Sequence, residues 1–129
     1  DKYVGNHIPH YRSSWEHAFM RFCDTNDNIL QWASEAISIP YRNPLTGKMS
    51  RYVPDFFVSY RDKNNKIKAE IIEIKPKKQS MITERMSTRD RAAVAVNMAK
   101  WDQATKWCRK NAMTFRVVTE EEIFHQGTR

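Results

Sequence analysis

The sequence is poor in the residues that mark fibrous, disulfide-rich and membrane proteins. Its 129 residues contain only three glycines, five prolines and two cysteines. Such low glycine and proline contents exclude collagen-like and low-complexity chains, and two cysteines are too few for a small secreted disulfide scaffold. No apolar run approaches the roughly 18 residues that a membrane-spanning helix needs. We therefore expect a single domain over residues 1–129 that is not secreted, with Cys23 and Cys108 as buried or half-buried free thiols.

Positive charge exceeds negative charge along the chain. Lysine and arginine number 22 against 15 aspartate and glutamate residues, which gives a formal net charge of +7 and an isoelectric point near 9.6. A basic protein favours polyanionic partners such as nucleic acid. Charge alone does not identify the partner, so the chemistry has to come from motifs.

Helical and extended patterns alternate along the chain and predict the element order α-β-β-β-α-β. After an irregular arm over residues 1–12, Ser13 and Glu16 form a capping-box pattern that predicts a helix ending near residues 24–28. Strand patterns over residues 29–41, 52–60 and 67–75 are separated by turn-forming segments. Three strands joined in this way predict an antiparallel meander.

The second half of the chain predicts one helix and one more strand. A basic segment over residues 77–91 lacks a clean period, and we expect it to be a mobile connection. Residues 92–110 show helical spacing, and a final strand follows over residues 115–118. The long helix permits a parallel crossover. The expected fold class is α/β, with a mixed sheet whose antiparallel meander is flanked by helices. The predicted buried stripe of the helix consists of Val94, Met98, Trp101, Thr105 and Cys108.

Three charged residues interrupt the apolar strands. Asp55 lies inside an aromatic strand, where aspartate is disfavoured, and Glu73 and Lys75 lie two apart at the end of the next strand, so they share one face. A turn centred on Asn64 would place Asp55 directly opposite Glu73, with Cα atoms about 4.5–5.5 Å apart. Two carboxylates at that distance repel unless a cation lies between them. This register is an assumption, because it requires a turn of odd length.

Such a group of oxygen ligands has a preferred chemistry. Without a cluster of cysteine and histidine, paired carboxylates suit Mg²⁺ or Mn²⁺ better than Zn²⁺. A hard cation beside a lysine suits phosphodiester hydrolysis, because the metal polarises the phosphate while the ammonium orients water or stabilises developing charge. Glu73 and Lys75 could alternatively be an ion pair at the rim of a sheet.

The pattern Pro54-Asp55 followed by Glu73-Ile74-Lys75 resembles the PD-(D/E)xK nuclease superfamily. Further segments resemble the head-completion nucleases of T-even-type phages, which are similar to TnsA endonucleases of transposons. One departure from TnsA is that its third acidic position is a glutamine, where this chain has Glu73. The segments that carry the resemblance are residues 12–16, 32–35, 39–41, 51–55, 72–78 and 115–121.

The resemblance implies a restriction-endonuclease-like core and a Mg²⁺-dependent DNA endonuclease in which Mn²⁺ can substitute. It makes Glu16, Asp55 and Glu73 metal ligands, together with the Ile74 carbonyl, and makes Lys75 the catalytic lysine. It further implies processing of packaged DNA ends during phage head completion. DNA and phage head, portal or neck proteins would be the partners, in the cytoplasm of an infected bacterial host or in the virion.

Alternatives remain open for several of these residues. Glu16 could serve only the helix cap, and Glu35 could be either a carboxylate near the site or a structural residue. A basic set after the third strand could contact DNA phosphates or form a solvated loop. A transposition endonuclease subunit and a non-catalytic DNA-binding head protein are the alternative functions. The basic set consists of Lys77, Lys78, Arg85, Arg89 and Arg91.

Overall fold

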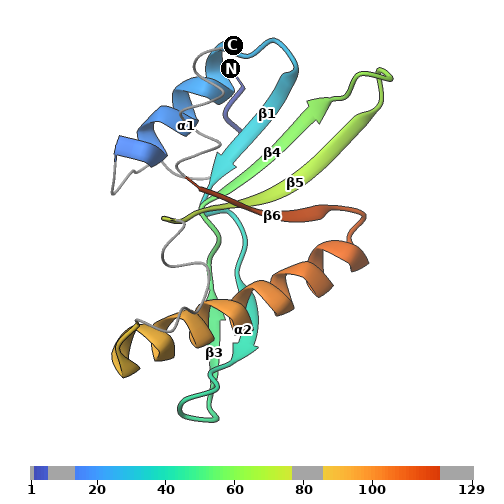
Figure 1. Ribbon diagram of the computed structural model, residues 1–129. Coiled ribbons are helices and arrows are strands. Elements are labelled where there is room, and N and C mark those ends of the chain that lie inside the picture. The colour runs from blue at the N-terminus through green and yellow to red at the C-terminus, as the bar shows by residue number, and fades with distance from the viewer. Residues whose placement is uncertain (1, 6–13, 77–85, 120–129) are drawn as a thin grey trace.

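The computed structural model describes residues 2–5, 14–76 and 86–119, and in these ranges it contains two helices and six strands. Strands β1, β4, β5 and β6 form a four-stranded sheet in that order, while β2 and β3 form a separate hairpin (Figure 1). The mixed α/β fold class is confirmed. The elements are α1 (Ser14–Thr25), β1 (Ile29–Ser34), β2 (Ile39–Arg42), β3 (Met49–Tyr52), β4 (Phe56–Arg61), β5 (Ile67–Ile74), α2 (Thr88–Lys110) and β6 (Thr114–Val118).

Two of the predicted strands are each divided in two, so the predictions of single strands over residues 29–41 and 52–60 are wrong. The first breaks after β1, where Glu35 has a positive φ of 48° that turns the chain out of the sheet. The second breaks between Tyr52 and Phe56, around Pro54, which has no N–H to donate to a neighbouring strand. The freed segments β2 and β3 pair with each other, from Ile39 opposite Tyr52 to Arg42 opposite Met49.

The antiparallel register of β4 and β5 is the one that the sequence predicts. Phe56 lies opposite Ile72, and the pairing continues without a shift to Arg61 opposite Ile67. The turn of odd length that this register requires is present, with Asn65 at a φ of 63°. β1 pairs antiparallel with β4, so β1, β4 and β5 form the expected meander once the β2–β3 hairpin is set apart.

The crossover through α2 joins β5 to a parallel β6, as predicted. The helix, however, starts at Thr88 rather than residue 92, because the Ser87 side chain accepts a hydrogen bond from the Asp90 N–H and caps it. Arg89 and Arg91 therefore belong to α2 and not to a mobile connection. Residues 77–85 lie outside the described part of the chain, as do residue 1 and residues 6–13 of the predicted arm.

The buried stripe of α2 also differs from the prediction. Val94 and Cys108 are buried as expected and Trp101 is half-buried, but Met98 is 47% exposed and Thr105 is exposed. Ala104 takes the central place in the stripe, since its small side chain lets the helix approach the β2–β3 hairpin closely.

Two apolar clusters lie on opposite faces of the four-stranded sheet. The first places Phe19 and Cys23 of α1 against alternating residues of β4 and β5, such as Phe56 and Ile72. The second joins α2 to the β2–β3 hairpin, with half-buried Phe115 of β6 packed against it. Both cysteines are buried and free, as predicted. Neither described helix has the length and apolar character that a membrane span requires.

The N-terminal residues attach to the first cluster. Of the predicted irregular arm, residues 2–5 are described, and Tyr3 forms a parallel bridge with Trp32 of β1. The Lys2 ammonium donates to the carbonyls of Cys23 and Asn26, at 3.3 and 2.8 Å, so it caps the C-terminal end of α1. A cation at this end of a helix is favourable, because the unpaired carbonyls carry negative partial charge.

Replacing Asp24 with alanine should lower the free energy of unfolding by about 1–2 kcal/mol. The Asp24 carboxylate accepts a 2.8 Å hydrogen bond from the indole of Trp32, a residue only 3% exposed, and the variant leaves that N–H unpaired. Urea unfolding followed by tryptophan fluorescence measures the difference. Asp27→Ala, at an exposed position just beyond α1, is the control. An equal loss in both variants would contradict this role of the hydrogen bond.

Candidate active site

Asp55, Glu73 and Lys75 meet where β4 begins and β5 ends. Asp55 directly precedes β4, Glu73 lies one residue before the end of β5, and Lys75 directly follows that strand. Side chains alternate along a strand, so Glu73 and Lys75 share one face. The strand pairing ends at Phe56 opposite Ile72, and Asp55 and Glu73 are the next residues along the two segments, joined by a hydrogen bond from the Asp55 N–H to the Glu73 carboxylate. The sequence prediction that these three residues come together is therefore met by the fold.

A small set of hydrogen bonds holds the two carboxylates. Oδ2 of Asp55 accepts from the backbone N–H of Ile74 at 2.8 Å. The backbone N–H of Asp55 in turn donates to the Glu73 carboxylate, so hydrogen bonds run in both directions between Asp55 and the end of β5. The Lys75 Nζ lies 3.6 Å from Glu73 Oε2. Glu73 is only 6% exposed, so compensation of its charge depends on Lys75 and on hydrogen bonds from the protein.

The pKa values show that this compensation is incomplete. Burial raises the pKa of Asp55 to about 7, and the neighbouring charge of Glu73 adds to this, while the hydrogen bond from Ile74 and the charge of Lys75 oppose it. Burial also raises the pKa of Glu73, against the hydrogen bond from Tyr52 and the charge of Lys75. The pair therefore retains a proton close to neutral pH, which is the behaviour of two carboxylates that share a site with too little positive charge.

Glu16 lies in the first turn of α1 and is half-buried. Its charge also raises the pKa of Asp55, so the two carboxylates interact across the space between helix and strand. Within the described ranges, however, no three histidine, cysteine, aspartate or glutamate side chains converge closely enough to hold a metal ion. The structure thus brings Asp55 and Glu73 together and leaves Glu16 beside them. Its role as a ligand, like that of the Ile74 carbonyl, stays a prediction.

The basic residues predicted to contact DNA are only partly described. Lys77, Lys78 and Arg85 lie outside the described residues. Arg89 and Arg91 are exposed in the first turns of α2, where the Arg91 guanidinium donates to the Met86 carbonyl at 3.3 Å. Their contact with DNA stays a prediction.

Sequence reasoning missed Tyr52. Its hydroxyl donates a 2.8 Å hydrogen bond to Oε1 of Glu73, from the end of β3. Burial and the nearby Glu73 charge raise the pKa of this phenol, so it stays a donor over the working range of pH. The Lys100 ammonium of α2 lies 5.7 Å from the centre of the same ring. No motif signals this contact, because it depends on where the β2–β3 hairpin lies against β5.

Glu35 acts on the site through its backbone. Its N–H donates to the Asp55 carbonyl at 3.0 Å, from a residue whose φ of 48° is unusual for a side chain other than glycine. Such a conformation costs about 1 kcal/mol or more and persists where surrounding contacts demand it. This contact agrees with the structural alternative for Glu35, since it fixes the main chain of Asp55.

The free energy of unfolding of the wild-type protein should fall as pH rises, and Asp55→Asn should abolish this fall. The unfolded chain ionises Asp55 near pH 4, whereas the folded protein does so near 7, the raised pKa of this carboxyl. The folded state therefore binds more protons across this interval, and its free energy of unfolding falls as pH rises. In EDTA, the variant should be more stable than wild type by up to about 4 kcal/mol near pH 8 and equal to it near pH 4, because each pH unit between the two pKa values contributes about 1.4 kcal/mol. Thermal unfolding at both pH values measures this, and a constant difference would contradict it.

Comparison with known proteins identifies relatives. The family described as TnsA-like endonuclease N terminal matches residues 26–120, a range that includes Asp55, Glu73 and Lys75 but not Glu16. The head completion nuclease of Enterobacteria phage T4 is 33% identical over 123 residues, covering 88% of this chain and 79% of that protein. No solved structure matches the chain.

Both relatives are the ones that the sequence motifs resemble, so the predicted resemblance is confirmed. The match spans the whole of the four-stranded sheet and the crossover helix between β5 and β6. The chain therefore belongs to the TnsA-like endonuclease family.

Proposed function

We propose that this protein is a DNA endonuclease of the PD-(D/E)xK type that requires Mg²⁺ or Mn²⁺ and processes packaged DNA ends during phage head completion. The observation that carries the proposal is the pair of half-buried Asp55 and buried Glu73 with Lys75 beside it, in a chain of an endonuclease family. The T4 relative, named a head completion nuclease, supports the phage setting. Action in the host cytoplasm or the virion, with head, portal or neck proteins as partners, is part of the same proposal.

The donor atoms fit a hard divalent cation. The negative charges of the Asp55 and Glu73 carboxylates are only partly compensated by the protein. Burial therefore raises the pKa of both residues. Carboxylate and carbonyl oxygens are the ligands that Mg²⁺ prefers, and this ion keeps several waters when few protein ligands are available. We assign the two carboxylates as ligands, with the Ile74 carbonyl and Glu16 as the further candidates. When bound, the cation supplies Lewis-acid polarisation of the phosphodiester.

The protein's own residues supply position and charge. Lys75 places an ammonium next to Glu73, where it can orient a water toward phosphorus and stabilise the negative charge that develops on the phosphate. Tyr52 fixes the orientation of the Glu73 carboxylate by its hydrogen bond. The Ile74 N–H and the Glu35 N–H hold the side chain and main chain of Asp55. Fixed groups of this kind raise the rate because they do not have to reorganise during the reaction.

A transposition endonuclease subunit is the second candidate, because the matching family description names TnsA. The two candidates share the site chemistry and differ in partners. A transposition subunit acts with a transposase, whereas an enzyme that processes phage DNA ends should cut DNA without one. A purified chain that cuts linear duplex alone therefore favours the phage function.

Glu73→Gln and Lys75→Met should each lower DNA cleavage by at least about 100-fold with Mg²⁺ or Mn²⁺, because Glu73 is assigned to hold the cation and Lys75 to stabilise the developing charge. Cleavage of supercoiled plasmid and linear duplex, with EDTA and Ca²⁺ as metal controls, measures the rates. Lys106→Met removes another ion-paired lysine, one on α2 that is more exposed than Lys75 and pairs with Asp102 at 3.0 Å, and it should leave the rate unchanged. A non-catalytic DNA-binding protein would show no metal-dependent cleavage in any of the four proteins.

Metal binding should be measurable without activity. Mn²⁺ or Mg²⁺ should raise the melting temperature near pH 8. The free energy of unfolding should increase by about 1–3 kcal/mol at a metal concentration 10 to 100 times the dissociation constant. Asp55→Asn and Glu73→Gln should lose this gain, and Glu16→Gln should reduce it if Glu16 is a ligand. Asp27→Asn, an exposed acidic residue in the described region, is the control for weak surface binding. An equal gain in all variants would contradict a metal site at Asp55 and Glu73.

A further inference from the structure

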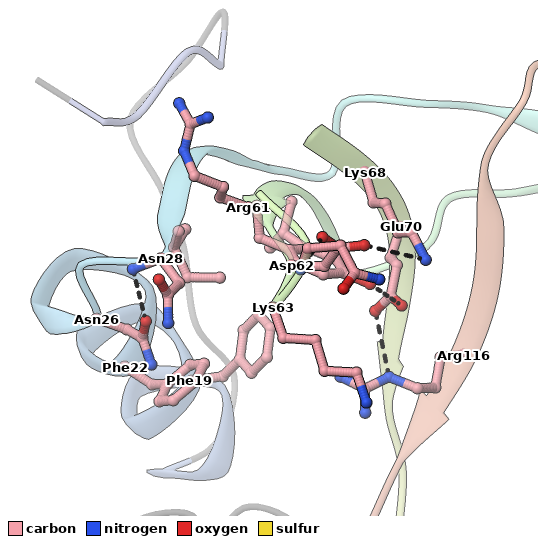
Figure 2. A pocket seen from close by; sticks show the side chains of 14 residues that line it. Phe19, Phe22, Asn26, Asn28, Arg61, Asp62, Lys63, Lys68, Glu70 and Arg116 are labelled. Atoms are coloured by element: carbon pink, nitrogen blue, oxygen red, sulfur yellow. Dashed lines mark hydrogen bonds and ion pairs between the residues drawn. The ribbon is translucent and has the colours of Figure 1, made fainter. Parts of the chain in front are cut away.

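A cavity of about 530 Å³ opens at the far end of β4 and β5 from the carboxylate pair. It lies between the second half of α1 and the turn that joins the two strands (Figure 2). Along β5, Lys68 at the cavity and Glu73 at the candidate active site are roughly 16 Å apart. Glu70 and Glu73 also face opposite sides of the sheet. The cavity is therefore a separate place on the protein, and neither the family match nor the candidate active site accounts for it.

The inner wall of the cavity is apolar and partly aromatic. Phe19 and Phe22 of α1 line it together with Ile29 and Val58, and Tyr60 continues the aromatic surface on β4. Phe22 and Tyr60 are half-buried, so their rings are accessible from the opening. Aromatic rings of this kind are stacking surfaces for nucleobases, because every base has a planar face. The volume is within the range of pockets that hold small ligands.

The rim of the cavity carries an excess of positive charge. Its two carboxylates are already compensated within the protein: Glu70 accepts from the Tyr60 hydroxyl at 2.9 Å and pairs with Arg116 at 3.3 Å, and Asp62 pairs with Lys68 at 3.4 Å. Two further cations remain at the rim.

Lys63 and Arg61 are these two cations. Neither makes an ion pair with a carboxylate of the described residues, and the Arg61 guanidinium donates only to the Asn65 side chain, at 3.2 Å. In Figure 2 the Lys63 side chain lies between the phenylalanine rings of α1 and Arg116 of β6. The C-terminal end of α1, which would otherwise repel an anion here, is capped by the Lys2 ammonium. In the same figure the Arg61 guanidinium points away from Lys63 and from the phenylalanine rings, so the cavity presents an aromatic wall and one available cation, Lys63.

We propose that this cavity binds one nucleotide, with its base against the ring of Phe22 and its phosphate against Lys63. A planar base attached to an anion matches both surfaces, whereas a purely apolar ligand leaves Lys63 unpaired and a simple anion leaves the rings uncovered. The nucleotide can come from a DNA strand or from free mononucleotide. The first source rests on the proposed function, since it makes the cavity a contact for substrate DNA away from the bond that is cut.

The matched pair Lys63→Ala and Lys66→Ala tests this site on the full chain in EDTA. Both lysines are exposed on the same turn, but only Lys63 lines the cavity. Fluorescence anisotropy with a labelled single-stranded oligonucleotide should show weaker binding for Lys63→Ala than for Lys66→Ala by about three- to tenfold, with a smaller dependence on salt. Phe22→Leu should weaken binding by about tenfold, because it removes the stacking surface. Equal affinities in the two lysine variants would overturn the proposal.

A further arm identifies the source, and the conditions of measurement separate this proposal from the active site. The arm is a titration with dAMP in which amide chemical shifts are measured by NMR. If free mononucleotide binds, the shifts of the β4–β5 turn and of the C-terminal end of α1 should change, and Lys63→Ala should abolish these changes. Response to the oligonucleotide but not to dAMP supports a nucleotide within a DNA strand, and response to neither overturns the proposal. These binding measurements are made in EDTA and need no cleavage, so a failure of the catalytic assignment leaves their result intact.

Discussion

The Asp62 carboxylate holds the turn on which the candidate active site depends. Its Oδ1 accepts from the N–H groups of Asn64 and Lys66, both at 2.9 Å, and Asn65 completes the turn in a left-handed conformation. These contacts set an odd number of residues between β4 and β5. A shift of one residue would move Glu73 and Lys75 to the opposite face of the sheet, away from Asp55. The chemistry at one end of the two strands is thus positioned by hydrogen bonds at the other end.

Bringing the carboxylates together has an energetic cost that the surroundings offset only in part. The Ile74 N–H, the Tyr52 hydroxyl and the Lys75 ammonium all favour ionised carboxylates. Burial and mutual repulsion exceed their effect, since the pKa values of Asp55 and Glu73 remain raised. Functional sites commonly keep such local instability because the groups that react cannot also be those that best stabilise the fold. A bound cation would remove most of this repulsion.

The sequence was sufficient for those parts of the structure that local patterns determine. The register of β4 and β5 follows from alternation plus the centre of one turn, and the parallel β6 follows from a long helix between two strands. The start of α2 could also have been found, because Ser87 and Asp90 have the spacing of a helix cap although the intervening residues lack an apolar period. The separation of the β2–β3 hairpin could not, since Pro40 and Pro54 are equally compatible with edge strands. Tyr52 was missed for the same reason, because its contact joins two elements that no local pattern places together.

The hydrogen bond from Tyr52 comes from outside the sheet that carries its acceptor. Glu73 belongs to the four-stranded sheet, whereas Tyr52 ends a hairpin whose apolar side packs against α2. The ring of Tyr52 also lies beneath Lys100 of that helix. The Tyr52 phenol therefore joins the hairpin to the main sheet by a side-chain hydrogen bond, outside the strand pairings of that sheet. A displacement of the hairpin relative to β5 would break this bond and change the charge balance on Glu73, even with every strand pairing of the main sheet in place.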